Sequence, residues 1–337
     1  MSRIGVLGAG SWGTALAIHA AAAGFEVVLW ARDARLATEL SERRRNLKYL
    51  PDAKLPKGIS PTADMQDLED LATVLVVVPS HGFRDVVQRF LGQRAGSGPL
   101  ILISATKGIE TEGVCRMSQV VAEEAQNVDY DVRIAVLSGP SFAVELAAGQ
   151  PTAAVIASGD EALAVELSGR LSTPTFRLYS TTDVTGVELG GAGKNVIAIG
   201  AGIVSGLGLG HNTLAALITR GLHEIARLGV ACGGQVQTFS GLAGLGDLVL
   251  TCTGGLSRNR RTGLELAAGK SLEEIQRQTS MVAEGIRNSL SLTRLARREQ
   301  IEMPITEQMM AVMYEGKAPS QALQDLMTRA LKAESEL

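Results

Sequence analysis

The chain has 337 residues, of which 45% are hydrophobic and 20% charged, so it is too apolar for a disordered protein and long enough for two domains. Its formal net charge is -3, so we expect no nucleic-acid partner, and an anionic ligand would need a local cluster of cations. The three cysteines and four histidines are scattered along the chain. This spacing favours neither a disulfide framework nor a metal site, and it fits a reducing compartment.

The first half of the chain alternates strand-like and helix-like segments. Short apolar or β-branched runs occur at residues 4–7, 27–30, 74–78, 100–103, 134–137 and 153–156. Helix-compatible stretches such as 14–23 and 85–91 lie between them. Near-continuous apolar strands separated by helices form parallel sheets that helices cover on both faces. We therefore predict a doubly wound (Rossmann-type) α/β domain over residues 1–185.

A glycine-rich turn follows the first predicted strand directly and precedes a predicted helix. It has the pattern G-x-G-x-x-G, with Gly8, Gly10 and Gly13 around Ser11 and Trp12. The first glycine permits a tight turn, the second lets the backbone approach a pyrophosphate, and the third lets helix and strand pack closely. The N–H groups at the helix start then face the anion. The turn predicts a dinucleotide site, and a glycine-rich turn without a ligand is the alternative.

The next strand ends before Arg32 and Asp33. An arginine here suits a 2′-phosphate and favours NADPH, whereas an acidic residue suits the ribose hydroxyls of NADH. A solvated loop arginine is the alternative. Lys107 follows the strand predicted at 100–103, at the sheet edge where ligands of such domains bind. The alternative is that Lys107 is exposed to solvent, as isolated lysines usually are.

Helical periodicity replaces the strand pattern after about residue 185. Apolar residues from Leu214 to Leu228 recur at three- and four-residue steps, and similar patterns occupy 264–268, 286–296 and 305–314. We predict an all-helical domain over residues 186–337. Residues 196–210 are apolar but shorter than a membrane span, so we predict a buried helix, and the glycine-interrupted N-terminus does not read as a signal peptide.

Residues 186–210 contain nine glycines. Such a density indicates the close approach of a neighbouring helix, a cofactor or a substrate, because each glycine costs a helix about 1 kcal/mol. Lys194 lies among them, and burial there would lower its pKa and suit it to proton transfer. A lysine that extends from the helix to solvent is the alternative.

Two further groups in the second half carry polar chemistry. Asp247 ends a glycine-rich run and either orients Lys194 or a substrate hydroxyl, or caps a helix that begins at Leu248. Ser257, Arg258 and Asn259 are donors compatible with a phosphate, and a solvated helix face is the alternative.

These motifs, taken in order, resemble those of the bacterial NAD(P)-dependent glycerol-3-phosphate dehydrogenases. The resemblance covers nearly the whole chain and runs through the turn at 8–13, Thr106-Lys107-Gly108, 138–143, 190–195, Gly244-Leu245-Gly246-Asp247, 257–260 and Val282-Ala283-Glu284-Gly285. It implies a second domain like that of 6-phosphogluconate dehydrogenase, and the reduction of dihydroxyacetone phosphate to sn-glycerol 3-phosphate with NADPH or NADH. It also implies a cytoplasmic enzyme that supplies glycerol 3-phosphate for phospholipid synthesis, and a homodimer is compatible with it.

The resemblance also assigns roles to individual residues. Lys194 is the implied catalytic acid/base. The implied substrate contacts are Lys107, Gly139, Ser141, Lys194, Asp247, Ser257, Arg258 and Asn259. The implied cofactor contacts beyond the glycines are Ser11, Trp12, Arg32, Asp33, Tyr49, Lys107, Ala143, Arg258, Val282 and Glu284.

The residues at 138–141 are consistent with these roles. They follow the strand predicted at 134–137, and Pro140 suits the first turn of a helix whose N–H groups would face an anion or hydroxyl.

Two rival interpretations stay open. One is a reductase of another small hydroxy acid, of the ketopantoate or 6-phosphogluconate type, against which the donors at Ser257 to Asn259 weigh. The other is a nucleotide-binding sensor without catalysis, which would need neither Lys194 nor Asp247.

Overall fold

The computed structural model describes residues 2–96, 98–277, 283–331 and 333–334, and the chain divides into two compact units. Unit 1 contains Met1–Thr106 and Met117–Val184, and unit 2 contains Lys107–Arg116 and Thr185–Leu337. The domain boundary that we proposed after residue 185 lies beside the step from Val184 to Thr185. The segment 107–116, which that proposal placed in the first domain, clusters instead with unit 2.

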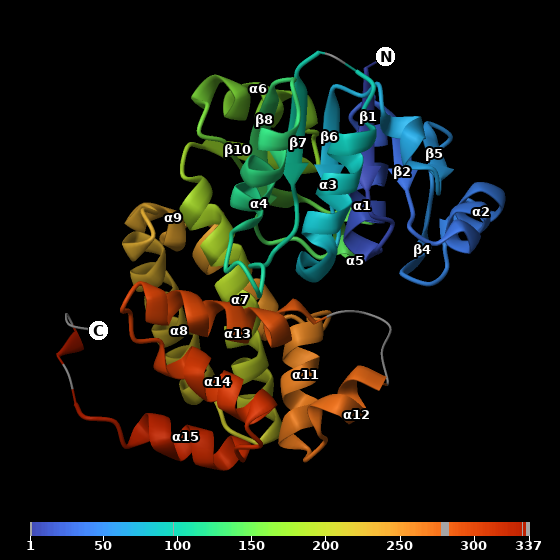
Figure 1. Ribbon diagram of the computed structural model, residues 1–337. Helices are drawn as coiled ribbons and strands as arrows, with labels where there is room; N and C mark the ends of the chain where they lie inside the picture. Colours follow the sequence, from blue (N-terminus) through green and yellow to red (C-terminus); the bar gives the residue numbers. More distant parts are fainter. Residues whose placement is uncertain (1, 97, 278–282, 332, 335–337) are drawn as a thin grey trace. The chain divides into compact units, whose positions relative to one another are not determined.

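Unit 1 is built on an eight-stranded sheet with the order β10-β9-β8-β7-β6-β1-β2-β5 (Figure 1). Its strands are β1 (Arg3–Leu7), β2 (Glu26–Trp30), β5 (Ile59–Thr62), β6 (Thr73–Val76), β7 (Leu100–Ser104), β8 (Val132–Ser138), β9 (Thr152–Ala157) and β10 (Phe176–Thr181). A separate antiparallel pair joins β3 (Arg45–Asn46) to β4 (Leu50–Lys54). The predicted doubly wound α/β domain is confirmed.

The sheet departs from the predicted parallel arrangement at one step, because β8 and β9 pair antiparallel. A continuous apolar run shows that a strand is buried on both faces but does not encode its direction. Two edge strands, β10 and β5, have no continuous apolar run and were not predicted. In β10 buried and exposed residues alternate at its start, and β5 contains Pro61, which is tolerated at a sheet edge.

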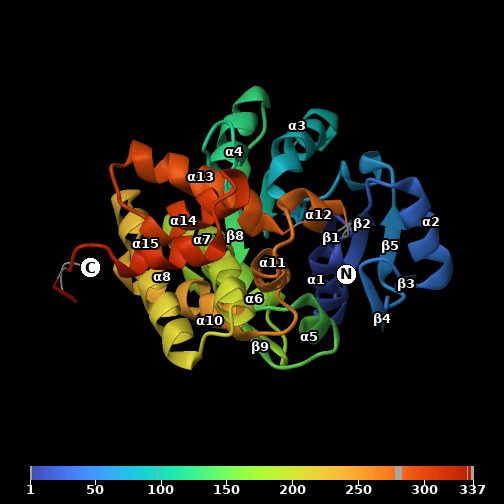
Figure 2. The same ribbon diagram turned by 90° about the horizontal axis from the view of Figure 1, so that it is seen from below.

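Helices cover both faces of this sheet, as Figures 1 and 2 show. On one face α1 (Ser11–Ala22), α5 (Ala143–Ala147) and α6 (Glu161–Leu171) contribute to one apolar core. On the other face α3 (Phe83–Gln93) packs against α4 (Met117–Glu124). The remaining helix, α2 (Ala34–Arg43), packs on β5. Short 3₁₀ turns lie at Met65–Leu68, Ser80–Gly82 and Ala125–Asn127.

Unit 2 is helical, as predicted. Its helices are α7 (Val184–Gly206, whose first residue belongs to unit 1), α8 (His211–Ala231), α9 (Val236–Ser240), α10 (Asp247–Thr253), α11 (Arg258–Ala267), α12 (Leu272–Arg277), α13 (Glu284–Arg298), α14 (Pro304–Tyr314) and α15 (Pro319–Met327). A π-helical turn, Leu242–Gly246, leads into α10. Within the described part of unit 2 the β pairing is limited to a single bridge between Ile109 and Arg116.

The central helix of unit 2 is α7. By length and composition it is apolar enough to cross a membrane, but its most apolar 18-residue window is 100% buried inside the protein. The buried helix predicted from residue 196 onward is therefore confirmed, although it ends at Gly206. The helix is part of the protein core.

The glycines of α7 allow neighbouring helices to approach closely. A Cβ atom at Gly202 would lie 1.9 Å from the carbonyl oxygen of Arg260 in α11, and one at Gly263 would lie 1.9 Å from the carbonyl oxygen of Ile199. A Cβ at Gly193 would lie 2.6 Å from Ile225 in α8. Of the three explanations that the glycine density left open, a neighbouring helix accounts for these positions.

Candidate active site

The backbone around Asp247 brings its carboxylate to α7. A Cβ at Gly190 would lie 2.7 Å from the carbonyl oxygen of Ala243, so α7 packs directly on the π-helical turn before Asp247. Such turns are frequent at functional sites because they redirect the side chains beside them. Asp247 is the first residue of α10, is fully buried, and makes no capping bond, since Gly246 is the N-cap residue. The helix-cap alternative is therefore wrong.

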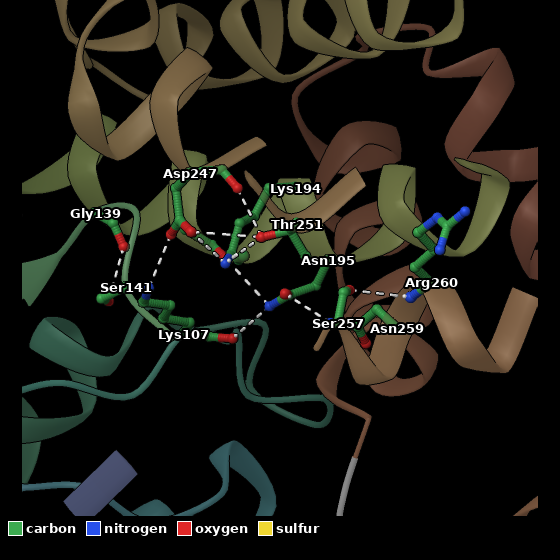
Figure 3. Close-up of polar contacts among 12 residues, drawn as sticks. Lys107, Gly139, Ser141, Lys194, Asn195, Asp247, Thr251, Ser257, Asn259 and Arg260 are labelled. Atoms are coloured by element: carbon green, nitrogen blue, oxygen red, sulfur yellow. Dashed lines mark hydrogen bonds and ion pairs between the residues drawn. The ribbon is translucent and has the colours of Figure 1, made fainter. Parts of the chain in front are cut away.

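Two lysines share the carboxylate of Asp247 (Figure 3). Lys194 Nζ donates to Oδ1 at 2.6 Å, and Lys107 Nζ donates to Oδ2 at 2.8 Å. Lys194 Nζ also donates to Thr251 Oγ1 at 2.9 Å, while the Thr251 hydroxyl donates to the carbonyl oxygen of Asp247 at 2.6 Å. Two cations and one buried anion leave a net positive charge, which suits an anionic substrate.

Lys194 is buried, with 6% of its surface exposed, so the predicted alternative of a lysine that reaches solvent is wrong. Burial lowers the pKa of its ammonium from 10.5 to about 8, because the charged form is poorly solvated there. The Asp247 carboxylate opposes this shift, and the Lys107 charge adds to it. The result is an ammonium that stays mostly protonated at neutral pH and gives up its proton more readily than an ordinary lysine.

The three donors after Asp247 have different surroundings. Ser257 is the N-cap of α11, where its hydroxyl oxygen accepts from the backbone N–H of Arg260 at 3.1 Å. This contact uses a lone pair and not the O–H donor. Arg258 is exposed at the first position of the helix. The N–H groups of this helix start and the guanidinium together are donors of the kind that bind phosphate.

Asn259 is buried and ties three segments together. Its Nδ2 donates to Asn195 Oδ1 at 2.8 Å, and its Oδ1 accepts from the backbone N–H of Gly285 at 3.0 Å. Asn195 Nδ2 in turn donates to the backbone carbonyl oxygen of Lys107 at 3.2 Å. A direct contact of Asn259 with substrate stays a prediction, and its observed role is to join α7, α11 and α13.

Unit 1 contains the glycine turn in the predicted strand–turn–helix setting. Gly8 has a φ of +119°, and a Cβ at Gly13 would lie 1.8 Å from the carbonyl oxygen of Gly8, so neither position admits a side chain. A Cβ at Gly10 would meet nothing within 4 Å, and Gly10 is the N-cap of α1 without a side-chain capping bond. The turn therefore fits a pyrophosphate, with open space at Gly10 and helix N–H groups beside it.

Asn46, which belongs to none of the sequence motifs, supports this turn. Asn46 is fully buried, and its Nδ2 lies 2.9 Å from the carbonyl oxygen of Ala9 and 2.7 Å from Thr14 Oγ1. Its Oδ1 accepts from the backbone N–H of Tyr49 at 3.1 Å. Asn46 thus links the glycine turn to the loop that carries Tyr49, one of the implied cofactor contacts.

The other implied cofactor contacts occupy several elements. Ser11 and Trp12 open α1, Arg32 is exposed after β2, and Asp33 caps α2 by accepting from the N–H of Arg35 at 2.9 Å. Glu284 is the first residue of α13 in unit 2. The implied contact Val282 lies outside the described residues.

The substrate contacts implied at 138–143 belong to unit 1. Gly139 has a φ of +139°, and a Cβ there would lie 2.8 Å from the Cα of Ala154. Ser141 Oγ donates to the carbonyl oxygen of Gly139 at 3.0 Å. The prediction that Pro140 lies in the first helical turn is wrong, because α5 begins at Ala143 with Phe142 as its N-cap.

Unit 2 contains one set of the predicted residues: Lys107, Lys194, Asp247, Ser257, Arg258 and Asn259. Hydrogen bonds join the two lysines to Asp247, and Asn195 joins Asn259 to the backbone of Lys107. Thr251 was missed, although its position four residues after Asp247 places both on one helix face.

Comparison with known proteins places this geometry in a family. The model for the N-terminus of NAD-dependent glycerol-3-phosphate dehydrogenase matches residues 3–164, and the model for its C-terminus matches residues 183–324. The chain belongs to this family. The predicted family is confirmed.

Individual members of the dehydrogenase family match along nearly their whole length. A glycerol-3-phosphate dehydrogenase (NAD(P)+) of Koribacter versatilis is 49% identical over 332 residues, covering 98% of both chains. One from Nitratidesulfovibrio vulgaris (strain DP4) is 50% identical over 333 residues, covering 98% of this chain and 100% of the other. The crystal structure of the Coxiella burnetii glycerol-3-phosphate dehydrogenase has a TM-score of 0.92 at 42% identity and covers 97% of this chain and 99% of the other.

The rival reductase family shares only the fold. A ketopantoate reductase of Ralstonia eutropha aligns with a TM-score of 0.59 at 16% identity, covering 95% of this chain and 99% of the other.

Proposed function

We propose that Lys194 is the proton donor as this protein reduces dihydroxyacetone phosphate to sn-glycerol 3-phosphate with NADPH or NADH. The chain is an NAD(P)-dependent glycerol-3-phosphate dehydrogenase. The assignment of Lys194 as proton donor depends on one observation. Its buried ammonium donates to one carboxylate oxygen of Asp247, and Lys107 donates to the other.

The residues of unit 1 fit a dinucleotide. The turn at Gly8, Gly10 and Gly13 would hold its pyrophosphate, and Arg32 would pair with a 2′-phosphate, which favours NADPH. When bound, the dinucleotide supplies the hydride that reduces the substrate ketone at C2.

Lys194 completes the chemistry on the oxygen of that ketone. As C2 gains the hydride, the carbonyl π bond breaks and its electron pair forms a bond to a proton from Lys194 Nζ. Among the described residues, Asp247 and Thr251 accept two of the three N–H donors of Lys194, and the third is available to a substrate oxygen. Asp247 fixes the direction of the ammonium, and the neutral amine regains a proton from solvent.

The phosphate of the substrate suits the start of α11. Arg258 offers a guanidinium that can bind phosphate through two donors, and Ser257 and the helix N–H groups add neutral donors. Lys107 supplies a second positive charge close to Lys194. A substrate without a phosphate would leave these donors without their acceptor, so it should react poorly.

The test follows NADPH absorbance when dihydroxyacetone phosphate is added to the purified protein. Dihydroxyacetone, which lacks the phosphate, is the matched control and should give a far slower decrease. Dinucleotide binding without any oxidation that depends on dihydroxyacetone phosphate would contradict the proposal and support the sensor interpretation. Equal rates with ketopantoate would favour the rival reductase.

We further propose that the enzyme works in the cytoplasm, where its product enters phospholipid synthesis. We also propose a homodimer, which sedimentation of the purified protein tests. A single species of the 35.3 kDa chain mass would contradict the dimer.

A further inference from the structure

The segment 107–116 belongs to unit 2 and begins at Lys107, whose ammonium reaches Asp247. Two buried amides donate to the backbone carbonyl oxygen of Lys107: Asn195 Nδ2 at 3.2 Å and Asn288 Nδ2 at 3.3 Å. A carbonyl oxygen has two lone pairs, so these donors satisfy it fully. The backbone beneath the Lys107 side chain is therefore fixed from two helices, α7 and α13.

Asn288 makes more contacts than this one. It is fully buried on α13, and its Nδ2 also donates to the carbonyl oxygen of Ala192 at 3.1 Å. Its Oδ1 accepts from the backbone N–H of Ile109 at 3.4 Å. The amide thus uses both of its donors and its acceptor on three backbone groups: two in the segment 107–116 and one in α7, two residues before Lys194.

The same helix face holds the segment at a second place. Ser291, three residues after Asn288, donates to the carbonyl oxygen of Ile109 at 3.1 Å. Residues three apart lie on one face of a helix, so α13 presents an aligned pair of polar groups to this segment. The contact of Ser291 does not involve Lys107, which makes it a useful control.

We propose that Asn288 is a positioning residue for the reduction: its side-chain amide fixes the backbone at residues 107–109 so that Lys107 reaches Asp247 beside Lys194. This inference rests on the proposed function. Among the described residues the hydrogen bonds of the Asn288 side chain all go to backbone groups, and its effect on the reaction passes through Lys107.

A positioning role for Asn288 predicts a shift in the pH profile of the reaction, which a purely structural role does not. Among the described residues, the titratable groups that face Lys194 are Asp247 and Cys252 of α10 and Lys107, and the Lys107 charge lowers the pKa of Lys194. If Asn288 fixes Lys107, loss of its amide should raise the pKa of Lys194. The decrease of kcat/KM for reduction with rising pH should then occur at higher pH.

The test compares Asn288→Leu, which is similar in volume but lacks hydrogen-bonding groups, with Thr293→Val, a buried polar-to-apolar change on the same helix. Asn288→Leu should lower kcat/KM for dihydroxyacetone phosphate about tenfold or more, because three buried backbone groups each lose one hydrogen-bond partner. It should also shift the pH profile upward. Thr293→Val should leave the pH profile unchanged, and Ser291→Ala should affect it less than Asn288→Leu.

A double-mutant cycle with Lys107→Met separates positioning from general damage. When Lys107 is already lost, Asn288→Leu should add little to the defect and should not shift the pH profile further. Additive losses, or a lower rate at an unchanged pH profile, would overturn the inference. If Asn288→Leu does not fold, the smaller change Asn288→Ser takes its place in the same cycle with the same two outcomes. Failure of the wild type to oxidise NADPH would instead contradict the proposed function.

Discussion

Neutralising Asp247 tests how the two lysines are controlled. Asp247→Asn keeps one oxygen acceptor but turns an amide N–H group toward the second lysine, and it removes the only anion among the described residues that bonds to both ammoniums. Because Asp247 raises the pKa of Lys194 in the native site, its loss should move that pKa below about 8.

The size of the shift follows from the cost of breaking a buried ion pair. Removing one partner costs about 3–5 kcal/mol, here divided between two lysines. One pKa unit corresponds to about 1.4 kcal/mol, so the pKa of Lys194 should fall by at least about one unit. At pH 7 the protonated fraction of Lys194 would fall from about nine tenths to about one half or less.

The assay is kcat/KM for dihydroxyacetone phosphate as a function of pH, because this parameter reports the pKa values of the free enzyme. In Asp247→Asn the decrease of kcat/KM with rising pH should begin at lower pH than in the wild type. Lowering the pH should restore part of the activity of this variant. Glu188→Gln is the matched control, because this buried carboxylate forms its ion pair with Arg116. If kcat/KM of Asp247→Asn decreases at the same pH as that of the wild type, Asp247 does not control the pKa of Lys194.

Three further changes test separate parts of the account. Arg258→Ala should raise KM for dihydroxyacetone phosphate about tenfold or more, because charged hydrogen bonds are lost. Arg261→Ala, a change at an exposed residue of the same helix, is the control, and an unchanged KM in Arg258→Ala would contradict the phosphate contact. Arg32→Ala should lower the ratio of kcat/KM for NADPH to that for NADH, and an unchanged ratio would exclude Arg32 from coenzyme selection. Burial raises the pKa of Glu224 from 4.5 to about 7, so its contribution to stability is fully present below about pH 4.5 and is lost as pH rises through about 7. Glu224→Gln should therefore reduce the decrease in Tm across this range, and the same pH slope in both proteins would contradict this.

The sequence predicts most clearly what depends on local patterns. In the turn at 8–13 the requirement for glycine is local, because Gly8 has a positive φ and a Cβ at Gly13 would collide with the carbonyl oxygen of Gly8. The structure places these positions as the motif requires. The helical stripe from Leu214 to Leu228 likewise lies within α8. The antiparallel direction of β9 and the pairing of β10 as an edge strand depend on neighbouring strands in the sheet. The local sequence pattern of each strand does not encode these features.

The site shows the same division. Lys194 and Asp247 were predicted as candidates because a charged residue in an apolar, glycine-rich run is unusual. Their burial and their shared ion pair result from packing between α7 and the π-helical turn, which no local spacing predicts. Asn46 and Asn288 were missed for a related reason. A buried asparagine acts through backbone groups far away in sequence, and its own surroundings carry no motif.

The most direct test of the central claim is kcat for reduction of dihydroxyacetone phosphate by Lys194→Ala, with dinucleotide binding measured on the same sample. Loss of a general acid should lower kcat by about 10²–10⁴-fold while dinucleotide binding to the glycine turn persists. Near-normal turnover in this variant would contradict the assignment of Lys194 as the proton donor.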